Sequence, residues 1–188
     1  MTAAFLQKPN ATFFLARGAV LAAALPALAI MLSACSTAAP LTDRVATSFI
    51  VVRHAEKATD DAKDPSLSRL GRQRADLLAA RLAQEPLVAA YATGFRRTRQ
   101  TAQPAADAHD IAISAYDAQL PAAVFASQLR AAHGRGTVLV VGHSNTVPEI
   151  VAALSGAPVD AMSEQQFDRL YRVSIDADGK ATLVEERY

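Results

Sequence analysis

The sequence predicts an α/β sandwich of three layers, with a mostly parallel central sheet and helices on both of its faces. Short apolar runs rich in β-branched residues alternate with longer segments in which apolar residues recur at helical spacing. Near the end of the chain, two further runs flank the segment Asp176–Lys180, which is typical of a tight turn. These two runs predict an antiparallel hairpin at one edge of the sheet.

The first half of the domain supplies two strands and two helices of this pattern. The run 47–52 predicts a buried strand, and 58–65 is a polar loop. Ser68 is a suitable cap for a helix in which small and apolar residues return every three or four positions, namely Gly71, Ala75, Leu78 and Leu82. Pro86 ends that helix, 87–91 predicts a second strand, and 97–109 predicts a helix that Pro104 kinks or divides.

The second half continues the alternation. A short strand is expected at 111–113, a helix at 120–132, the clearest strand at 137–141 and a helix at 147–154. The strands of the closing hairpin are expected at 171–175 and 181–185. The domain therefore spans residues 47–188.

The N-terminal segment has the layout of a secretory signal. Lys8 and Arg17 precede the uncharged run 19–32, which is short for a membrane span. The run ends in Leu-Ser-Ala-Cys, which resembles a bacterial lipobox. The resemblance implies that residues 1–34 are a lipoprotein signal peptide, that Cys35 is lipidated, and that 35–46 form a flexible tether. An uncleaved anchor and an ordinary signal peptide are the alternatives.

Composition excludes several classes of function. The chain has 19 Lys and Arg against 18 Asp and Glu, so it lacks the basic excess of a nucleic-acid-binding protein. Its single cysteine rules out a disulfide framework within one chain and disfavours a cysteine-based zinc site. No Walker-type phosphate loop is present in the sequence. We expect neither a cofactor nor a metal.

Two predicted strands are followed by histidine residues, which are expected to lie together at one edge of the sheet. His54 follows Arg53 after the first strand, His143 follows the strand 137–141, and Arg97 follows a third apolar run. Ligands of open α/β sheets bind at the carboxyl ends of the strands. Two guanidinium groups can hold a phosphoryl group, a neutral imidazole can attack its phosphorus, and a second, protonated histidine can neutralise oxygen charge. No metal is needed for this chemistry.

Four short motifs resemble the histidine phosphatase superfamily, whose fold is that of phosphoglycerate mutase. The segment 50–56 resembles its strand followed by Arg-His-Gly, and 67–71 resembles its Leu-Thr-x-x-Gly helix start. The segment 93–102 resembles its second block, in which an Arg lies four residues before Thr-Ala and is here Arg97. The segment 138–144 resembles the strand that ends in the second histidine. Ala55 and Thr93-Gly94 depart from the family pattern.

The resemblance implies roles for individual residues. His54 is the implied nucleophile, and Arg53, Arg97 and His143, together with Ser144, form the implied phosphate pocket. Only 46 positions separate Arg97 from His143, which resembles the small branch without a cap. A carboxylic acid from that interval usually protonates the leaving group. The candidates here are Asp107, Asp110 and Asp117, of which Asp117 is the best placed, on a loop at the carboxyl edge of the sheet.

These observations predict a metal-independent phosphatase that forms a phosphohistidine intermediate in the cell envelope. Its substrate is a phosphomonoester or a phosphoramidate, and its lipid anchor attaches it to a membrane with the domain outside the cytoplasm, in the periplasm. A non-catalytic phosphate-binding protein and a sugar-phosphate mutase are the alternative functions. The sequence does not identify the substrate.

Overall fold

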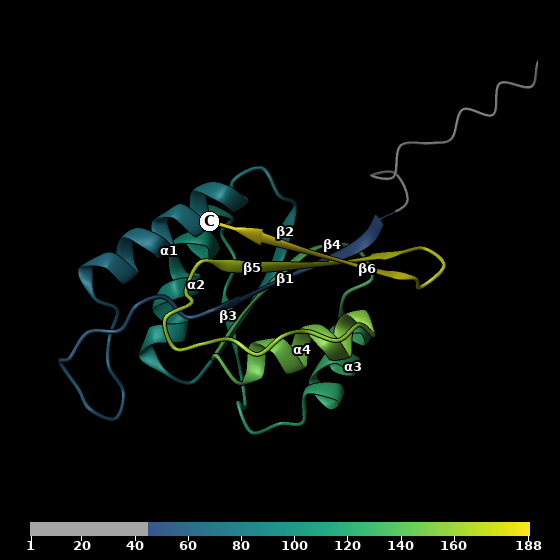
Figure 1. Cartoon of the computed structure of the whole chain (residues 1–188). Helices are drawn as coiled ribbons and strands as arrows, with labels where there is room; N and C mark the ends of the chain where they lie inside the picture. Colours follow the sequence, from purple (N-terminus) through teal and green to yellow (C-terminus); the bar gives the residue numbers. More distant parts are fainter. Residues whose placement is uncertain (1–44) are drawn as a thin grey trace, which may run out of the picture. The chain divides into compact units, whose positions relative to one another are not determined.

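The computed structural model describes residues 45–188, which form a six-stranded sheet with helices on both faces (Figure 1). The strand order is β3-β2-β4-β1-β5-β6. This arrangement confirms the predicted α/β fold, with its mostly parallel sheet and antiparallel edge strands. The predicted signal peptide and Cys35 lie outside the described residues, as does most of the predicted tether. No helix within residues 45–188 has the length and apolar character needed to cross a membrane.

Four parallel strands make up the part of the sheet that carries the histidines. They are β1 (Val45–Arg53), β2 (Leu87–Thr93), β3 (Ile113–Tyr116) and β4 (Gly136–Gly142). β1 and β4 are neighbours, and their register pairs Arg53 with Gly142. Because parallel strands end at the same edge of a sheet, the residues that follow β1 and β4 meet there.

The closing hairpin forms the other edge. β5 (Arg169–Asp176) pairs antiparallel with β1, and β6 (Ala181–Arg187) pairs antiparallel with β5. The turn between them contains Gly179 at φ 81°, a left-handed conformation that favours glycine. The hairpin therefore lies where its turn residues predict it.

One face of the sheet is covered by α1 (Arg69–Leu82) and α2 (Arg96–Ala108). The Ser68 hydroxyl caps α1 by accepting a hydrogen bond from the Gly71 amide at 3.0 Å. The four residues at helical spacing in α1 are its buried residues, as predicted. Pro104 lies inside α2 without dividing it, because the helix runs on to Ala108.

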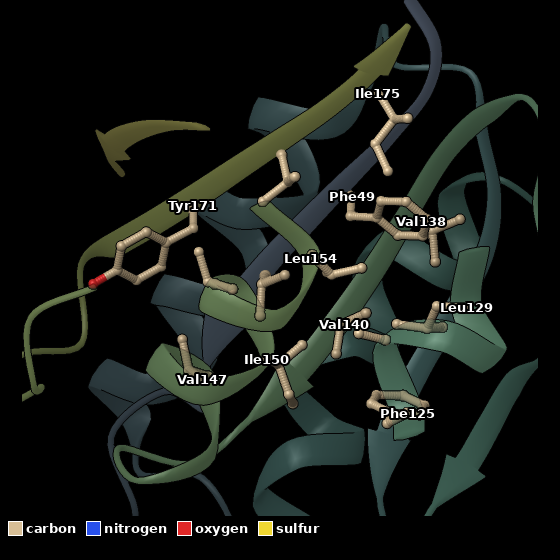
Figure 2. Close-up of a cluster of buried hydrophobic side chains, with 14 of the residues drawn as sticks. Phe49, Phe125, Leu129, Val138, Val140, Val147, Ile150, Leu154, Tyr171 and Ile175 are labelled. Carbon is tan, nitrogen blue, oxygen red and sulfur yellow. The ribbon is translucent and has the colours of Figure 1, made fainter. Parts of the chain in front are cut away.

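The opposite face is covered by α3 (Ala122–Ala132) and α4 (Thr146–Ser155). Figure 2 shows the core on this side, where Val147, Ile150 and Leu154 of α4 pack with Phe49 of β1 and Val140 of β4. Alternate residues of β1 and β4 point to the two faces, so both faces of these central strands are apolar. This burial holds the two histidine-bearing strands rigidly in register.

The third strand differs from the sequence-based expectation. A strand was expected at 111–113, whereas β3 spans Ile113–Tyr116. Asp110 adopts φ 53°, so the chain turns sharply after α2 before it can enter the sheet. The displaced strand brings Tyr116, and not Ile113, to the carboxyl edge.

Candidate active site

His54 and His143 lie side by side because they follow two neighbouring parallel strands. The His54 amide donates a hydrogen bond to the Gly142 carbonyl at 2.9 Å and so extends the pairing of β1 and β4 by one step. The two imidazole rings lie 5.4 Å apart between centroids and meet edge to face. Together with Arg53, Arg97 and Ser144, they line an open cavity of about 380 Å³. Five of the six predicted pocket residues therefore meet in one place.

The environment of His54 determines which of its nitrogens is free. Its side chain is buried, and Nδ1 lies 2.8 Å from the Ala55 carbonyl oxygen. A carbonyl oxygen can only accept, so Nδ1 carries the proton and Nε2 keeps its lone pair. The pKa of His54 is lowered to about 3, mainly by burial and also by the neighbouring His143, Arg53 and Arg97, while the Ala55 hydrogen bond opposes the shift. The ring is therefore neutral and nucleophilic at neutral pH.

His143 is also neutral in the free protein. Its pKa is lowered to about 4, mainly by burial and also by the charges of Arg97 and Arg53, while Glu164 opposes the shift. The protonated second histidine expected from the sequence belongs to the transition state, when oxygen charge develops on the phosphoryl group. A bound phosphoryl dianion would shift the pKa of His143 upward again.

A chain of hydroxyl groups orients the His143 ring. Nε2 lies 3.0 Å from the Thr93 hydroxyl, which lies 2.8 Å from the Thr98 hydroxyl. Thr98 donates its one proton to a carbonyl, with Phe95 the nearer acceptor at 2.8 Å. Thr98 must then accept from Thr93, and Thr93 must accept from His143 Nε2–H. Thr93, which departs from the family pattern, thus sets the tautomer of His143.

Arg53 is the most enclosed charge of the site, with its side chain 2% exposed. Nη1 donates to the carbonyls of Ser163 and Gln166 at 3.0 and 3.2 Å, and Nη2 donates to the Glu164 carboxylate at 2.8 Å. The Phe167 ring lies 4.2 Å from the guanidinium carbon. Burial lowers the pKa of Arg53, although Glu164 opposes that shift. The loop before β5 therefore wraps this arginine.

Arg97 comes from the first turn of α2 and faces the same cavity. Its guanidinium carbon lies 4.2 Å from the centre of the Phe95 ring, and that ring meets His143 edge to face at 5.4 Å. Asp64 is a distant partner at 3.8 Å. Each of the two arginines thus has an aromatic ring against one face of its guanidinium, which leaves the N–H groups along the edges of the plane to form hydrogen bonds.

The residue after His54 fits the site despite its departure from the family pattern. Ala55 is buried without a positive φ, so an alanine side chain causes no backbone strain. Its amide donates to the Thr101 hydroxyl at 2.9 Å, and Thr101 donates to the Arg97 carbonyl at 2.7 Å. Thr101 therefore links the nucleophile's loop to the helix that carries Arg97.

Asp117 stands apart from the other predicted residues. It follows β3 at the carboxyl edge of the sheet, as expected, but its carboxylate accepts a hydrogen bond from the Gln119 amide at 2.9 Å. Ala118 and Gln119, not Asp117, line the cavity. In this conformation Asp117 is not placed to protonate a leaving group.

Sequence reasoning missed the contribution of the segment 163–167. Glu164 lines the cavity and Phe167 stacks on Arg53, yet the segment has no regular apolar spacing and no family motif. Only the pairing of β5 with β1 brings the segment to the site. Within residues 45–188, no group of three or more His, Cys, Asp and Glu side chains is placed to hold a metal ion.

Comparison with known proteins agrees with this geometry. Residues 49–121 match the model of the histidine phosphatase superfamily, branch 1. No curated protein matched significantly by sequence. The structure of the protein histidine phosphatase SixA complexed with tungstate is similar, with a TM-score of 0.59 and 21% identity, over 74% of this chain and 96% of that one.

Two further solved structures share the fold. Phosphoserine phosphatase from Entamoeba histolytica has a TM-score of 0.58 at 14% identity, over 76% of this chain and 97% of that one. Phosphoglycerate mutase from Bacillus anthracis has a TM-score of 0.59 at 14% identity, over 78% of this chain and 95% of that one. Residues 49–121 are thus similar to the histidine phosphatase superfamily, and the solved structures share the fold of the described domain.

Proposed function

We propose that this protein is a metal-independent phosphatase that works through a phosphohistidine on His54. One observation carries the proposal. The free Nε2 of a neutral, buried His54 faces a cavity that Arg53, Arg97 and His143 also line. The arginines supply charge for a phosphoryl group, and the imidazole supplies the electron pair that attacks it.

In the first step, the Nε2 lone pair forms a bond to phosphorus while the bond from phosphorus to the leaving group breaks. The leaving group keeps the electron pair of that bond and takes a proton from solvent or from a donor. Arg53 and Arg97 stabilise the charge on the non-bridging oxygens. The Nδ1–H of the new phosphoimidazolium remains bonded to the Ala55 carbonyl, which stabilises the positive ring.

In the second step, water attacks the phosphorus and the P–N bond breaks. Its electron pair returns to Nε2, inorganic phosphate leaves, and the water proton passes to solvent. The loss of the imidazolium charge restores the neutral His54 that burial favours. The cycle therefore ends where it began and consumes one water for each phosphate released.

The availability of a proton donor for the leaving group helps to define the class of substrate. Asp117 points away from the cavity, and Glu164 is the carboxylate that lines it. A hydrogen bond from Ser144 and the charge of Arg53 lower the pKa of Glu164, so it is ionised and a poor acid in the free protein. This supports a substrate whose leaving group needs little protonation, such as a phosphoramidate or an aryl phosphate. The similar solved structure of SixA is described as a protein histidine phosphatase.

The open cavity supports a bulky substrate. Between Arg97 and His143 the chain contains the rest of α2, then β3, α3 and β4, which belong to the fold itself. This supports the small branch without a cap, and it favours a phosphatase over a sugar-phosphate mutase. We further propose that the substrate lies in the cell envelope, on the strength of the lipobox-like segment that ends at Cys35.

A single-turnover experiment tests the mechanism. His54→Asn should abolish release of inorganic phosphate from phosphohistidine peptides and p-nitrophenyl phosphate, and it should abolish the acid-labile phosphoenzyme of the wild type. His133→Asn makes the same exchange outside the cavity and should keep activity. A chelator should leave wild-type activity unchanged. Near-normal turnover by His54→Asn would refute the mechanism.

The same assay separates the alternatives. Binding of phosphate without turnover by the wild type would indicate a phosphate-recognising protein. Transfer of the phosphoryl group to a second hydroxyl of the substrate, without release of phosphate, would indicate a mutase.

A further inference from the structure

The Glu164 carboxylate lies on two groups that are expected to bind phosphate. One of its oxygens accepts from Arg53 Nη2 at 2.8 Å, and the other accepts from the Ser144 hydroxyl at 2.5 Å. Both donors line the cavity beside His54. A carboxylate and a phosphoryl group have similar pairs of oxygen acceptors, and both bind such donors. The Glu164 carboxylate therefore occupies the position where the phosphoryl group of the substrate is expected to bind.

This arrangement leaves Arg53 incompletely satisfied. Nη1 uses its two N–H groups on the Ser163 and Gln166 carbonyls, and Nη2 donates to Glu164. Nε is buried and has no acceptor among the described residues. Nε and Nη2 lie along one edge of the planar guanidinium, the edge that can bind an oxyanion with two bonds. Glu164 satisfies half of that edge, because its second oxygen turns to Ser144.

A buried N–H without an acceptor is costly, and a phosphoryl group has the oxygens to remove that cost. Two phosphoryl oxygens can accept from Nε and Nη2 of Arg53 while a third faces Ser144 or Arg97. In the observed geometry the carboxylate bonds Nη2 of Arg53 and the Ser144 hydroxyl and leaves Nε without an acceptor. The site is therefore better matched to the tetrahedral anion than to its own side chain.

Exchange of the two anions needs only a side-chain rotation. The backbone beside Glu164 is held by the Arg53 bonds to Ser163 and Gln166, and the Gln166 side chain accepts from the Ser163 amide at 2.7 Å. The Glu164 side chain is itself 66% exposed, so it has room to turn toward solvent. Its loop can stay in place while the carboxylate leaves.

We propose that Glu164 is a specificity-determining residue that acts as an internal competitor for the phosphoryl site, a proposal that rests on the phosphatase function above. In the free protein the carboxylate occupies the Arg53–Ser144 position, and the phosphoryl group of the substrate displaces it. The return of the carboxylate then helps to expel the phosphate product. The competition weakens binding of every simple oxyanion and favours substrates with further contacts to the cavity wall.

Oxyanion binding tests this without any need for turnover. Isothermal titration of the full-length protein with inorganic phosphate and with tungstate should show about tenfold tighter binding by Glu164→Gln than by wild type, because an ionic competitor is removed from a partly solvated site. Glu164→Asp keeps the charge on a shorter side chain and should bind with intermediate affinity. Glu149→Gln makes the same charge change on the exposed side of α4 and should match wild type.

Kinetics provide a second readout. With p-nitrophenyl phosphate as substrate, Glu164→Gln should lower KM. Because the variant no longer helps to expel the product, added phosphate should inhibit it about tenfold more strongly than wild type. Equal or weaker oxyanion binding by Glu164→Gln would overturn the proposal, since it would mean that the carboxylate merely helps to orient Arg53. If neither protein binds an oxyanion, the phosphate pocket itself fails, and this proposal fails with it.

Discussion

The hydrogen bond between His54 and the Ala55 carbonyl gives a nucleophilic nitrogen without any carboxylate partner. The acceptor belongs to the next residue of the same chain, so the tautomer is set by local backbone geometry. Burial then keeps the ring neutral. Two adjacent arginines would by themselves disfavour an imidazolium, and the structure adds desolvation as the larger cause.

The same burial makes protein stability depend on pH. The pKa of His54 is about 3 in the folded protein and about 6.5 in an unfolded chain, so between these values the unfolded state binds more protons. The free energy of unfolding should therefore fall as the pH falls below about 6.5. At pH 5 the contribution of His54 amounts to about 2 kcal/mol.

Urea unfolding at pH 7 and pH 5 measures this contribution. The wild type should lose about 2 kcal/mol more than His54→Asn between these two pH values, since asparagine does not titrate. His143 remains in both proteins and cancels to a first approximation. An equal loss in the two proteins would show that His54 is protonated without penalty in the folded state.

Among the elements, α1 packs closely against the loop that follows β1 and begins at His54. The Ser68 amide donates to the Glu56 carbonyl at 2.9 Å, and Arg74 of α1 binds the Glu56 carboxylate through Nε and Nη2. A side-chain carbon at Gly71 would lie 2.2 Å from the Glu56 carbonyl oxygen. The start of α1 thus rests directly on the backbone that follows His54.

Gly71→Ala should accordingly destabilise the protein and lower its activity. The added methyl group meets backbone, which cannot rotate away, and overpacking of this kind typically costs about 1–3 kcal/mol. The gain in helix propensity from alanine offsets about 1 kcal/mol of that cost. We expect a lower urea midpoint together with a reduced kcat, measured on the purified variant.

Gly134→Ala is the matched control. Gly134 has no atom within 4 Å of the added carbon and no positive φ, so its replacement should change neither quantity. If Gly71→Ala behaved like Gly134→Ala, the packing of α1 would not control the position of the nucleophile.

A helix or strand could be predicted from the sequence where a single local pattern of residues determines it. The central strands are uninterrupted apolar runs, and α1 has a cap and a regular buried stripe. The position of β3 was wrong because Asp110 turns the chain, and a left-handed aspartate leaves little trace in a pattern of apolar residues.

The residues of the candidate site likewise fall into those that a local pattern predicts and those that it does not. Arg53, His54 and His143 follow strands whose ends are forced together by parallel pairing, so their meeting is visible in the sequence. Asp117 and Glu164 lie in loops, where regular apolar spacing does not determine the direction of a side chain. Glu164 turns to Arg53, a tertiary contact that local spacing does not encode. Asp117 bonds the Gln119 amide two residues on, a local turn of the kind that an aspartate can form and that the prediction of a catalytic acid left out.

For the whole molecule, the segment before the domain carries the largest untested prediction. Cells that express the full chain and grow with a fatty-acid analogue should incorporate the label into the wild type. Cys35→Ala should incorporate none, because Cys35 is the only cysteine of the chain and the predicted acceptor. The two proteins should differ in membrane fractionation as well.

Ser36→Ala serves as the control, because it alters the adjacent position without removing the thiol, and it should retain the label. An unlabelled wild type would refute the lipoprotein prediction while leaving the phosphatase chemistry intact. Phosphohistidine peptides, sugar phosphates and phospholipid headgroups supplied to the same fractions would then compare candidate substrates.

The polarity of β1 has a consequence for how an anchored protein would meet its surroundings. The strand has 9 residues, with Val45 at one end and the residues of the cavity just beyond the other. At about 3.3 Å per residue, Val45, where the described domain begins, and the cavity lie about 30 Å apart along β1. If Cys35 carries the predicted lipid, the anchored segment joins the described domain at the end of β1 that is remote from the cavity.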